Sequence, residues 1–378
     1  MAEDTGIQWA GDENRMGATW NPWMGCTKVA ENRAGMPGSA CDFCYAETFA
    51  EPKYRKRVRD DLEAAGIEVT DDFSVVPLWG QHGIRQRVVT NWEAPITWDR
   101  KAAEGGYRLR VFTASLADVF ESHKSIQPEW RAHLFDLVER CRNLDWQVLT
   151  KRPGSIQHMI PKGWKAHWPR NCWIGTSVEH HGTVSRIEHL LALPGNPPVR
   201  FLSCEPLLSE IDLRPYLGAD KINWVIAGGE TGTGARPTDL DWVRSLRDQC
   251  AAAGVPFFYK QPGTIAGRGQ HKVEVPDIDD PEKKRDQWRL DDRHWWEWPV
   301  VQDPMKRRRG RPKNTHRGLR AALDSSERQA RKRSLRRHDE EAGWEEVIAR
   351  WLGPLPRDKR KEAAERLRKA ITRALKNT

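Results

Sequence analysis

Short apolar runs and helical patterns alternate along most of this chain. Six runs rich in β-branched and aromatic residues occur at 109–113, 146–150, 172–176, 199–203, 224–227 and 256–259. Such runs are typical of buried strands, and helices between them make consecutive strands parallel. With a further strand predicted at 19–21, the pattern predicts an α/β fold whose parallel sheet closes wholly or partly into a TIM-type barrel. A doubly wound open sheet is the alternative, because periodicity alone does not separate the two.

Several helices have recognisable ends. Pro128 suits the first position of a helix, since its missing N–H is not needed there. Asp239 or Asp241 can cap a later helix, and Gly254 can end it. One helix is predicted from Tyr45 to Lys56, and the Trp-, Pro- and Gly-rich segment 57–107 is predicted to be an irregular insertion.

Three of the seven cysteines lie in one stretch near the N-terminus. Cys41 and Cys44 have the C-x2-C spacing that lets two thiolates face one metal centre, and Cys26 can reach them across a loop. Three thiolates suit zinc completed by a histidine or water, and they equally suit a four-iron cluster with one open iron. The remaining cysteines fall in apolar patterns and are predicted to be buried core residues: Cys141, Cys172, Cys204 and Cys250.

Polar side chains follow every predicted strand. Parallel strands end at a common edge, where ligands bind in both candidate folds, so these side chains are candidate cofactor-binding residues. They are Ser115, Asp118, Lys151, Arg152, Ser177, Glu179, Glu205 and Glu230, with Lys260 and Gln261 after the last strand. Carboxylates beside cations suit a cofactor with an amino acid end and a ribose. His180 and His181 are predicted to lie on the surface at a helix start, the alternative being a fourth metal ligand.

Motifs around the cysteines and the strand ends resemble those of the phage and prophage three-cysteine-motif family, which is itself similar to radical S-adenosylmethionine (SAM) enzymes. The resemblance covers roughly residues 6–261. The motifs are Trp20-Asn21-Pro22, Gly25-Cys26-Thr27-Lys28, Cys44-Tyr45-Ala46-Glu47, the block ending at Asp118, Lys151-Arg152-Pro153, Gly175 to Glu179, Phe201 to Leu207 and Gly228 to Gly232. The usual radical-SAM loop is C-x3-C-x2-C, whereas fourteen residues separate Cys26 from Cys41 here.

This resemblance implies a fold, a cofactor and a reaction. It implies a radical-SAM barrel in which Cys26, Cys41 and Cys44 hold a [4Fe–4S] cluster that binds SAM at its open iron. The enzyme would release a 5′-deoxyadenosyl radical to modify or repair a nucleic-acid base, with phage DNA the expected target. Gly228-Gly229-Glu230 is similar to the motif that holds the SAM amino group, but it follows the sixth strand, and that role is not transferred.

A second function is compatible with the same residues. A Cys-ligated zinc could stabilise a DNA-binding protein that performs no catalysis and recruits a partner protein. A nuclease or glycosylase is a more distant alternative, because the chain has no G-x-S-x-G elbow and no H-E-x-x-H pair.

Charge divides the chain into a mildly acidic body and a basic tail. Residues 306–378 contain 24 Lys and Arg against 10 Asp and Glu, a net charge of +14, while the remaining residues carry −5. We therefore predict a barrel at 1–261, a closing segment over it at 262–305, and a polyanion-binding appendage at 306–378. Arg-Gly-Arg-Pro at 309–312 is the core of an AT-hook, which would place Arg309, Arg311 and Lys313 on duplex DNA.

The end of the tail has two amphipathic patterns, typical of a small helical hairpin with a basic face. The hairpin could bind DNA or dock on the barrel or on a protein partner. No apolar run of about 18 residues and no basic-then-apolar leader occurs, so we expect a cytoplasmic protein without membrane contact, in the bacterial host if phage-encoded. The oligomeric state stays open.

Overall fold

The structure is a computed structural model that describes residues 2–3, 5–30, 37–64, 75–88, 91–268, 271–274, 289–291, 293–300 and 364–365. The chain divides into two compact units. The first comprises residues 1–51 and 78–301, and the second comprises 52–77 and 302–378. The predicted DNA-binding residues Arg309, Arg311 and Lys313 lie outside the described residues, as does most of the predicted appendage.

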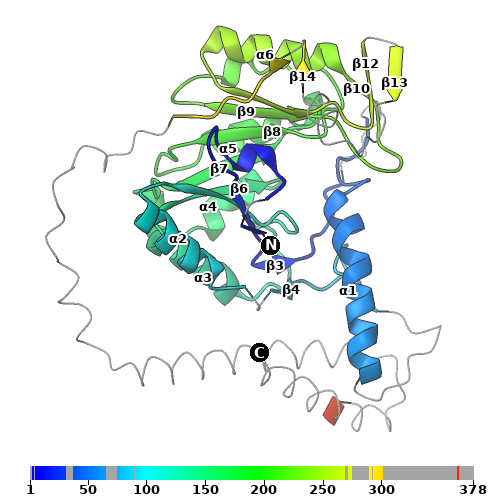
Figure 1. The fold of residues 1–378 in the computed structure, drawn as a ribbon, viewed down its shortest axis with the longest axis vertical. Helices are drawn as coiled ribbons and strands as arrows, with labels where there is room; N and C mark the ends of the chain where they lie inside the picture. Colours follow the sequence, from blue (N-terminus) through cyan, green and yellow to red (C-terminus); the bar gives the residue numbers. More distant parts are fainter. Residues whose placement is uncertain are drawn as a thin grey trace, which may run out of the picture. The chain divides into compact units, whose positions relative to one another are not determined.

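An eight-stranded sheet forms the centre of the first unit, in the order β1-β2-β5-β6-β7-β8-β9-β11 (Figure 1). Only β1 pairs antiparallel, so seven consecutive strands are parallel. The strands are β1 (Ala2–Glu3), β2 (Ala18–Trp20), β5 (Leu109–Thr113), β6 (Leu144–Thr150), β7 (Cys172–Ser177), β8 (Arg200–Cys204), β9 (Trp224–Gly228) and β11 (Phe257–Gln261). Every predicted strand is present, with bounds shifted by two residues or fewer.

The strand order decides between the two candidate folds. A doubly wound sheet reverses its order at a switch point and carries helices on both faces. Here the seven parallel strands follow chain order without a reversal, and right-handed crossovers then put every connecting helix on the same face. The sheet curls into a half-barrel, so the prediction of a partial TIM-type barrel is confirmed at this level.

Helices cover the outer face of the half-barrel. They are α2 (Ala94–Gly105), α3 (Pro128–Arg140), α4 (Pro153–Met159), α5 (Ser185–Leu191) and α6 (Leu240–Ala253). α2 packs against β5 and β6, and α6 packs against β9 and β11. Pro128 begins α3, Asp239 caps α6 by accepting from the Asp241 amide, and Gly254 ends α6 with φ +65°, all as predicted.

The prediction for residues 45–107 was partly wrong. α1 runs over Tyr45–Ala64, well beyond Lys56, because Tyr54, Val58 and Leu62 recur every four residues and are buried along one stripe. The segment expected to be irregular also contains α2, in which Pro95 occupies the first turn. The helix was not predicted because the segment is rich in Trp, Pro and Gly.

Besides the main sheet, the described residues form two two-stranded sheets and one three-stranded sheet. β3 (Trp23–Met24) pairs with β4 (Gln86–Arg87), and β14 (Arg289–Leu290) pairs with β15 (Arg293–His294). β12 (Ile265–Arg268) lies between β10 (Thr238–Asp239) and β13 (His271–Glu274).

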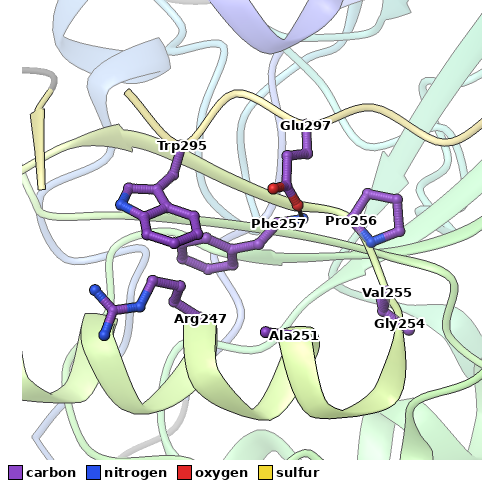
Figure 2. Close-up of a pocket in the computed structure, with 8 residues that line it drawn as sticks. All are labelled: Arg247, Ala251, Gly254, Val255, Pro256, Phe257, Trp295 and Glu297. Atoms are coloured by element: carbon purple, nitrogen blue, oxygen red, sulfur yellow. Dashed lines mark hydrogen bonds between the residues drawn. The ribbon is translucent and has the colours of Figure 1, made fainter. Parts of the chain in front are cut away.

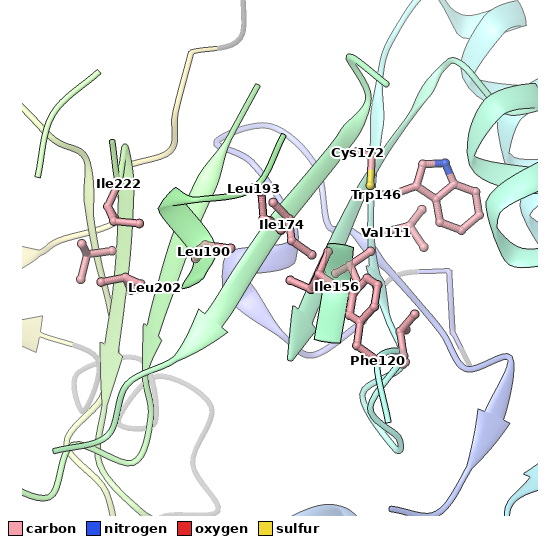
Figure 3. Packing of buried hydrophobic residues seen from close by; sticks show 14 of the residues in the cluster. Val111, Phe120, Trp146, Ile156, Cys172, Ile174, Leu190, Leu193, Leu202 and Ile222 are labelled. Carbon is pink, nitrogen blue, oxygen red and sulfur yellow. The ribbon is translucent and has the colours of Figure 1, made fainter. Parts of the chain in front are cut away.

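The two faces of the sheet bury different side chains. The outer face is largely aliphatic and packs with the helices, as Figure 3 shows for Val111, Ile174 and Leu202. The inner face is aromatic. Trp9, on the short helix Gln8–Ala10, fills the half-barrel and meets Phe112 at 4.5 Å and Trp224 at 6.1 Å between ring centroids. Residues from opposite strands therefore share one aromatic core.

Residues 296–298 cover the outer edge of β11, the last strand of the sheet. Trp296 stacks on Phe258 at 5.9 Å, and the Trp224 indole donates to the Glu297 carbonyl at 2.9 Å. Trp298 donates to the Trp9 carbonyl at 3.3 Å. This segment masks backbone groups that an open sheet edge would expose.

Candidate cofactor and metal site

The carboxyl ends of the parallel strands bring together the residues that the sequence singled out. Ser115 and Asp118 follow β5, Lys151 and Arg152 follow β6, Ser177 ends β7 and Glu179 follows it, Glu205 follows β8, and Glu230 follows β9. The predicted location is therefore confirmed for all eight. What each side chain contacts there differs from residue to residue.

Cys26 is placed over the end of β5 by its neighbour Gly25. The Gly25 amide donates to the Leu116 carbonyl at 2.9 Å, and Gly25 forms a bridge with Ala117. Gly25 has φ +99°, and a Cβ there would collide with the Leu78 carbonyl oxygen, so only glycine fits. The cysteine that follows is thereby held at the edge of the sheet.

Arg152 lies beneath Cys26 and holds it. Its Nη1 contacts the Cys26 Sγ at 3.6 Å and the Asp118 Oδ2 at 2.8 Å, while Nη2 donates to the Thr27 carbonyl. Asp118 also accepts from the Thr150 hydroxyl at 2.7 Å and from the Lys151 amide at 3.1 Å. Asp118 and Arg152 thus bind one another and the cysteine loop, which suits positioning of the loop.

A buried ion pair, which was not predicted from the sequence, fixes Thr27, the residue after Cys26. Arg85 binds Glu121 through two bonds of 2.9 and 2.7 Å, and the two side chains are 0% and 2% exposed. Glu121 accepts from the Thr27 amide at 2.7 Å, and Arg85 donates to the Thr27 hydroxyl at 2.6 Å. No local pattern marks Arg85, because it lies in the segment predicted to be irregular and 58 positions from Thr27.

Cys41 and Cys44 are held from another direction. Cys44 directly precedes α1, where backbone amides of the first turn interact with its sulfur. Arg236 binds Glu230 at 2.6 and 2.8 Å and donates to the carbonyls of Pro37 and Ser39 at 3.2 and 3.0 Å. Arg236 thus ties the loop before Cys41 to the end of β9, across 199 positions of sequence.

This edge carries three thiols of the kind that ligate metals, Cys26, Cys41 and Cys44. Burial, with help from Asp118 and Glu121, raises the pKa of the Cys26 thiol well above its usual range, and burial also raises the pKa of Cys44. Lys151 interacts electrostatically with Cys41 and Cys44, as Arg152 does with Cys26, so a cation accompanies each thiol. Among the described residues, no three His, Cys, Asp or Glu side chains are close enough together to hold a metal ion. Ligation would require the loop to draw the thiols together.

His180 does not lie where it was predicted. It precedes the short helix His181–Thr183, so the helix start is confirmed, and His181 is exposed. His180 itself is only 1% exposed, because its ring accepts from the Gly182 amide and turns into the edge, near Lys151 and Arg236. The four cysteines predicted to be core residues are buried, as expected.

Most carboxylates at this edge are already neutralised by cations of the chain. Glu179 is fully buried and binds Lys151 through one oxygen and Arg186 at 2.8 Å through the other. Glu230 is bound by Arg236. Glu205 differs, as its Oε2 accepts from Lys260 at 3.3 Å and its buried Oε1 has no hydrogen-bond partner among the described residues.

A shallow pocket of about 310 Å³ lies elsewhere, where α6 ends and β11 begins (Figure 2). Trp295 and Phe257 lie above Arg247 there, and the Phe257 amide donates to Glu297 at 3.0 Å. Phe257 is the first residue of β11, so this pocket is at the amino end of the strands. It does not coincide with the cysteine edge.

Fold and site together define an α/β half-barrel protein with a cysteine loop over the carboxyl ends of its strands. Residues 4–299 match the family described as "Protein of unknown function (DUF5131)". The chain belongs to this family, since the match covers more than half of its length. No curated protein and no solved structure matches the chain. In the described part of the chain, no helix combines the length and apolar character needed to cross a membrane.

Proposed function

We propose that this protein is a radical-SAM enzyme that acts on a nucleic-acid base or nucleotide. The observation that carries the proposal is the position of the three cysteines, which one loop brings to the carboxyl edge of a parallel half-barrel with Lys151 and Arg152 beside them. A thiolate cluster would add negative charge beside these two cations, which in the structure are paired with Glu179 and Asp118.

The residues of the chain have separate tasks in this proposal. Cys26, Cys41 and Cys44 would hold a [4Fe–4S] cluster, which when bound supplies the electron that cleaves SAM. Arg152, Arg85 and Arg236 hold the loop that carries the thiols. Asp118, Glu179 and Glu230 keep the cations of this edge in place. Ser115, whose hydroxyl accepts from the Asn21 amide at 3.1 Å, would meet the polar groups of SAM at this edge, whereas Ser177 is buried.

Metal analysis tests the proposal directly. Protein purified and reconstituted without oxygen is expected to be brown, to contain about four irons and matching sulfide per chain, and to cleave SAM when reduced. Iron, sulfide and zinc are measured together with 5′-deoxyadenosine. A colourless protein with one tightly bound zinc and no cleavage would refute the radical-SAM assignment.

The alternative is a zinc-stabilised DNA-binding protein without catalysis. His180 is buried, and in this alternative its imidazole would be the fourth ligand once the loop had drawn the three thiols to it. In that case His180→Ala would lower zinc content as much as a cysteine substitution does. Under the radical-SAM proposal the same substitution leaves iron content unchanged.

The basic tail is proposed to tether the protein to duplex DNA in the cytoplasm. Full-length protein should bind duplex with an affinity that falls with salt by about 0.9 log units per log unit for each phosphate contacted. Removing residues 306–378 should abolish most of this binding and leave SAM cleavage intact, and Arg311→Ala should reduce a preference for A·T tracts. Fluorescence anisotropy at several salt concentrations measures the duplex affinity and the preference for A·T tracts, and 5′-deoxyadenosine formation measures SAM cleavage. Unchanged binding after truncation would place the DNA surface on the barrel and make the tail a protein-docking segment.

A further inference from the structure

The connection between α4 and β7 concentrates positive charge on the otherwise acidic body of the protein. No Asp or Glu occurs in the sequence from 146 to 178, and within this range Lys162, Lys165 and Arg170 lie close together. All three side chains are exposed, and no carboxylate of the described residues pairs with them. Their full charge therefore faces solvent.

Two tryptophans anchor this connection to the core. Trp164 and Trp168 are 2% and 4% exposed, and their rings lie 5.3 Å apart. The Trp164 indole donates to the Glu139 carboxylate at 2.7 Å, and the Trp168 indole donates to the Cys172 carbonyl at 2.8 Å. The cations beside these rings are thus carried by a backbone that is fixed from below.

The backbone conformation puts the two lysines on one side. Lys162–Lys165 form a short 3-10 helix, in which side chains three positions apart are eclipsed. The His167 amide donates to the Gly163 carbonyl at 3.0 Å and closes the next turn. Lys162 and Lys165 therefore point the same way.

Arg142 extends the charged surface from the neighbouring loop. The Asn171 side chain donates to the Cys141 carbonyl at 3.0 Å, which brings the residues on either side, Arg170 and Arg142, next to one another. Arg142 is exposed, and its guanidinium bonds a backbone carbonyl, that of Glu139 at 3.3 Å, rather than a carboxylate. We call Arg142, Lys162, Lys165 and Arg170 the basic patch.

The character of the basic patch favours phosphate over other ligands. Lys151 and Arg152, at the cysteine edge, are already paired with Glu179 and Asp118, whereas a phosphate at the basic patch displaces no carboxylate. The exposed large hydrophobic side chains of the described residues all lie elsewhere. The patch therefore has no ring on which an unpaired base could stack and no apolar centre of the kind that protein interfaces use.

We infer that the basic patch binds the phosphodiester backbone of double-stranded nucleic acid without preference for sequence. The patch precedes Cys172, the first residue of β7, so it lies at the amino ends of the strands, away from the cysteine edge. It holds part of the duplex that is not reacting and adds to the binding by the tail. The inference deepens the proposed function, which supplies the nucleic acid as substrate.

Duplex binding by the full-length protein tests the inference. Lys162→Gln with Lys165→Gln should weaken binding to a duplex of about 30 base pairs about five-fold at about 50 mM salt. The slope of log affinity against log salt should become shallower by about 1.8, since each phosphate contact adds about 0.9. A·T-rich and G·C-rich duplexes should be affected equally, because phosphates carry no sequence information. Fluorescence anisotropy measures the affinities with DNA and with an RNA duplex of the same sequence, and a loss with either supports the inference.

A charge-matched variant separates contact from net charge. Arg214→Gln with Lys221→Gln also removes two exposed cations, which lie between β8 and β9 and bond Asp212 and the Pro215 carbonyl. This variant should keep the salt slope and lose less than about two-fold in affinity. Thermal unfolding should show that both variants are folded. Equal losses in the two variants, or an unchanged salt slope in the Lys162 and Lys165 variant, would overturn the inference.

The outcome is distinguishable from that of the proposed function. Duplex binding needs neither iron nor SAM, so a zinc protein whose salt slope depends on Lys162 and Lys165 would retain the inference and refute the radical-SAM proposal. An iron protein that cleaves SAM, and whose patch variant binds duplex as tightly as the unsubstituted protein, would do the opposite.

Discussion

Replacing Arg85 by methionine is expected to lower the free energy of unfolding by about 3–5 kcal/mol, because Glu121 would remain buried and unpaired. The two side chains are 0% and 2% exposed and share two short bonds. Urea denaturation at neutral pH measures the loss. Arg140→Met is the control, since Arg140 pairs with Asp136 on an exposed helix face and should cost less than about 1 kcal/mol. Equal losses in the two variants would contradict the structure.

Removing both partners should cost much less than removing one. Arg85→Met with Glu121→Leu leaves no uncompensated charge, although the Thr27 amide and hydroxyl lose their partners. Burial alone would raise the pKa of Glu121, but bonds from Arg85 and Thr27 hold it below its ordinary value. The pair therefore stabilises the protein above about pH 4, and this contribution is lost as the pH falls through the lowered pKa. When the free energy of unfolding is measured at decreasing pH, the double variant should not show the loss of stability that protonation of Glu121 causes.

Single replacement of Cys26, Cys41 or Cys44 by alanine is expected to abolish iron binding and SAM cleavage. Each thiol would be one of only three protein ligands, and a cluster held by two is not retained. Iron and sulfide content, visible absorbance and 5′-deoxyadenosine formation measure the effect. Product formation should fall to the background of protein that was not reconstituted.

Cys250→Ala is the matched control for these variants. Cys250 lies on α6, is fully buried in the outer core and is far in sequence from the cysteine loop. Its replacement removes only a small core volume, so iron content and SAM cleavage should be retained. If one of the three loop variants kept full iron content and cleavage, that cysteine would be a structural residue and the ligand set would need another member.

Local patterns in the sequence determined the strands, the helix ends and the polar edge. Strand runs, Pro128 at a helix start and Gly254 at a helix end depend on backbone preferences of a few neighbouring residues. Parallel strands must also end at one edge, so the residues that follow each strand could be named in advance. Sequence alone placed Glu205 and Asp118 at the same edge, but it did not distinguish their roles.

Only the tertiary structure decided which side chains are satisfied. Arg85 meets Thr27 across 58 positions, and Arg236 meets Pro37 across 199, so neither contact leaves a periodic signal in the sequence. Asp118 is bound by Arg152 and by Thr150, whereas one oxygen of Glu205 has no partner among the described residues. Hydrophobic periodicity sets which face of a strand is buried. The partners of a charge depend on where the curl of the sheet brings distant loops together.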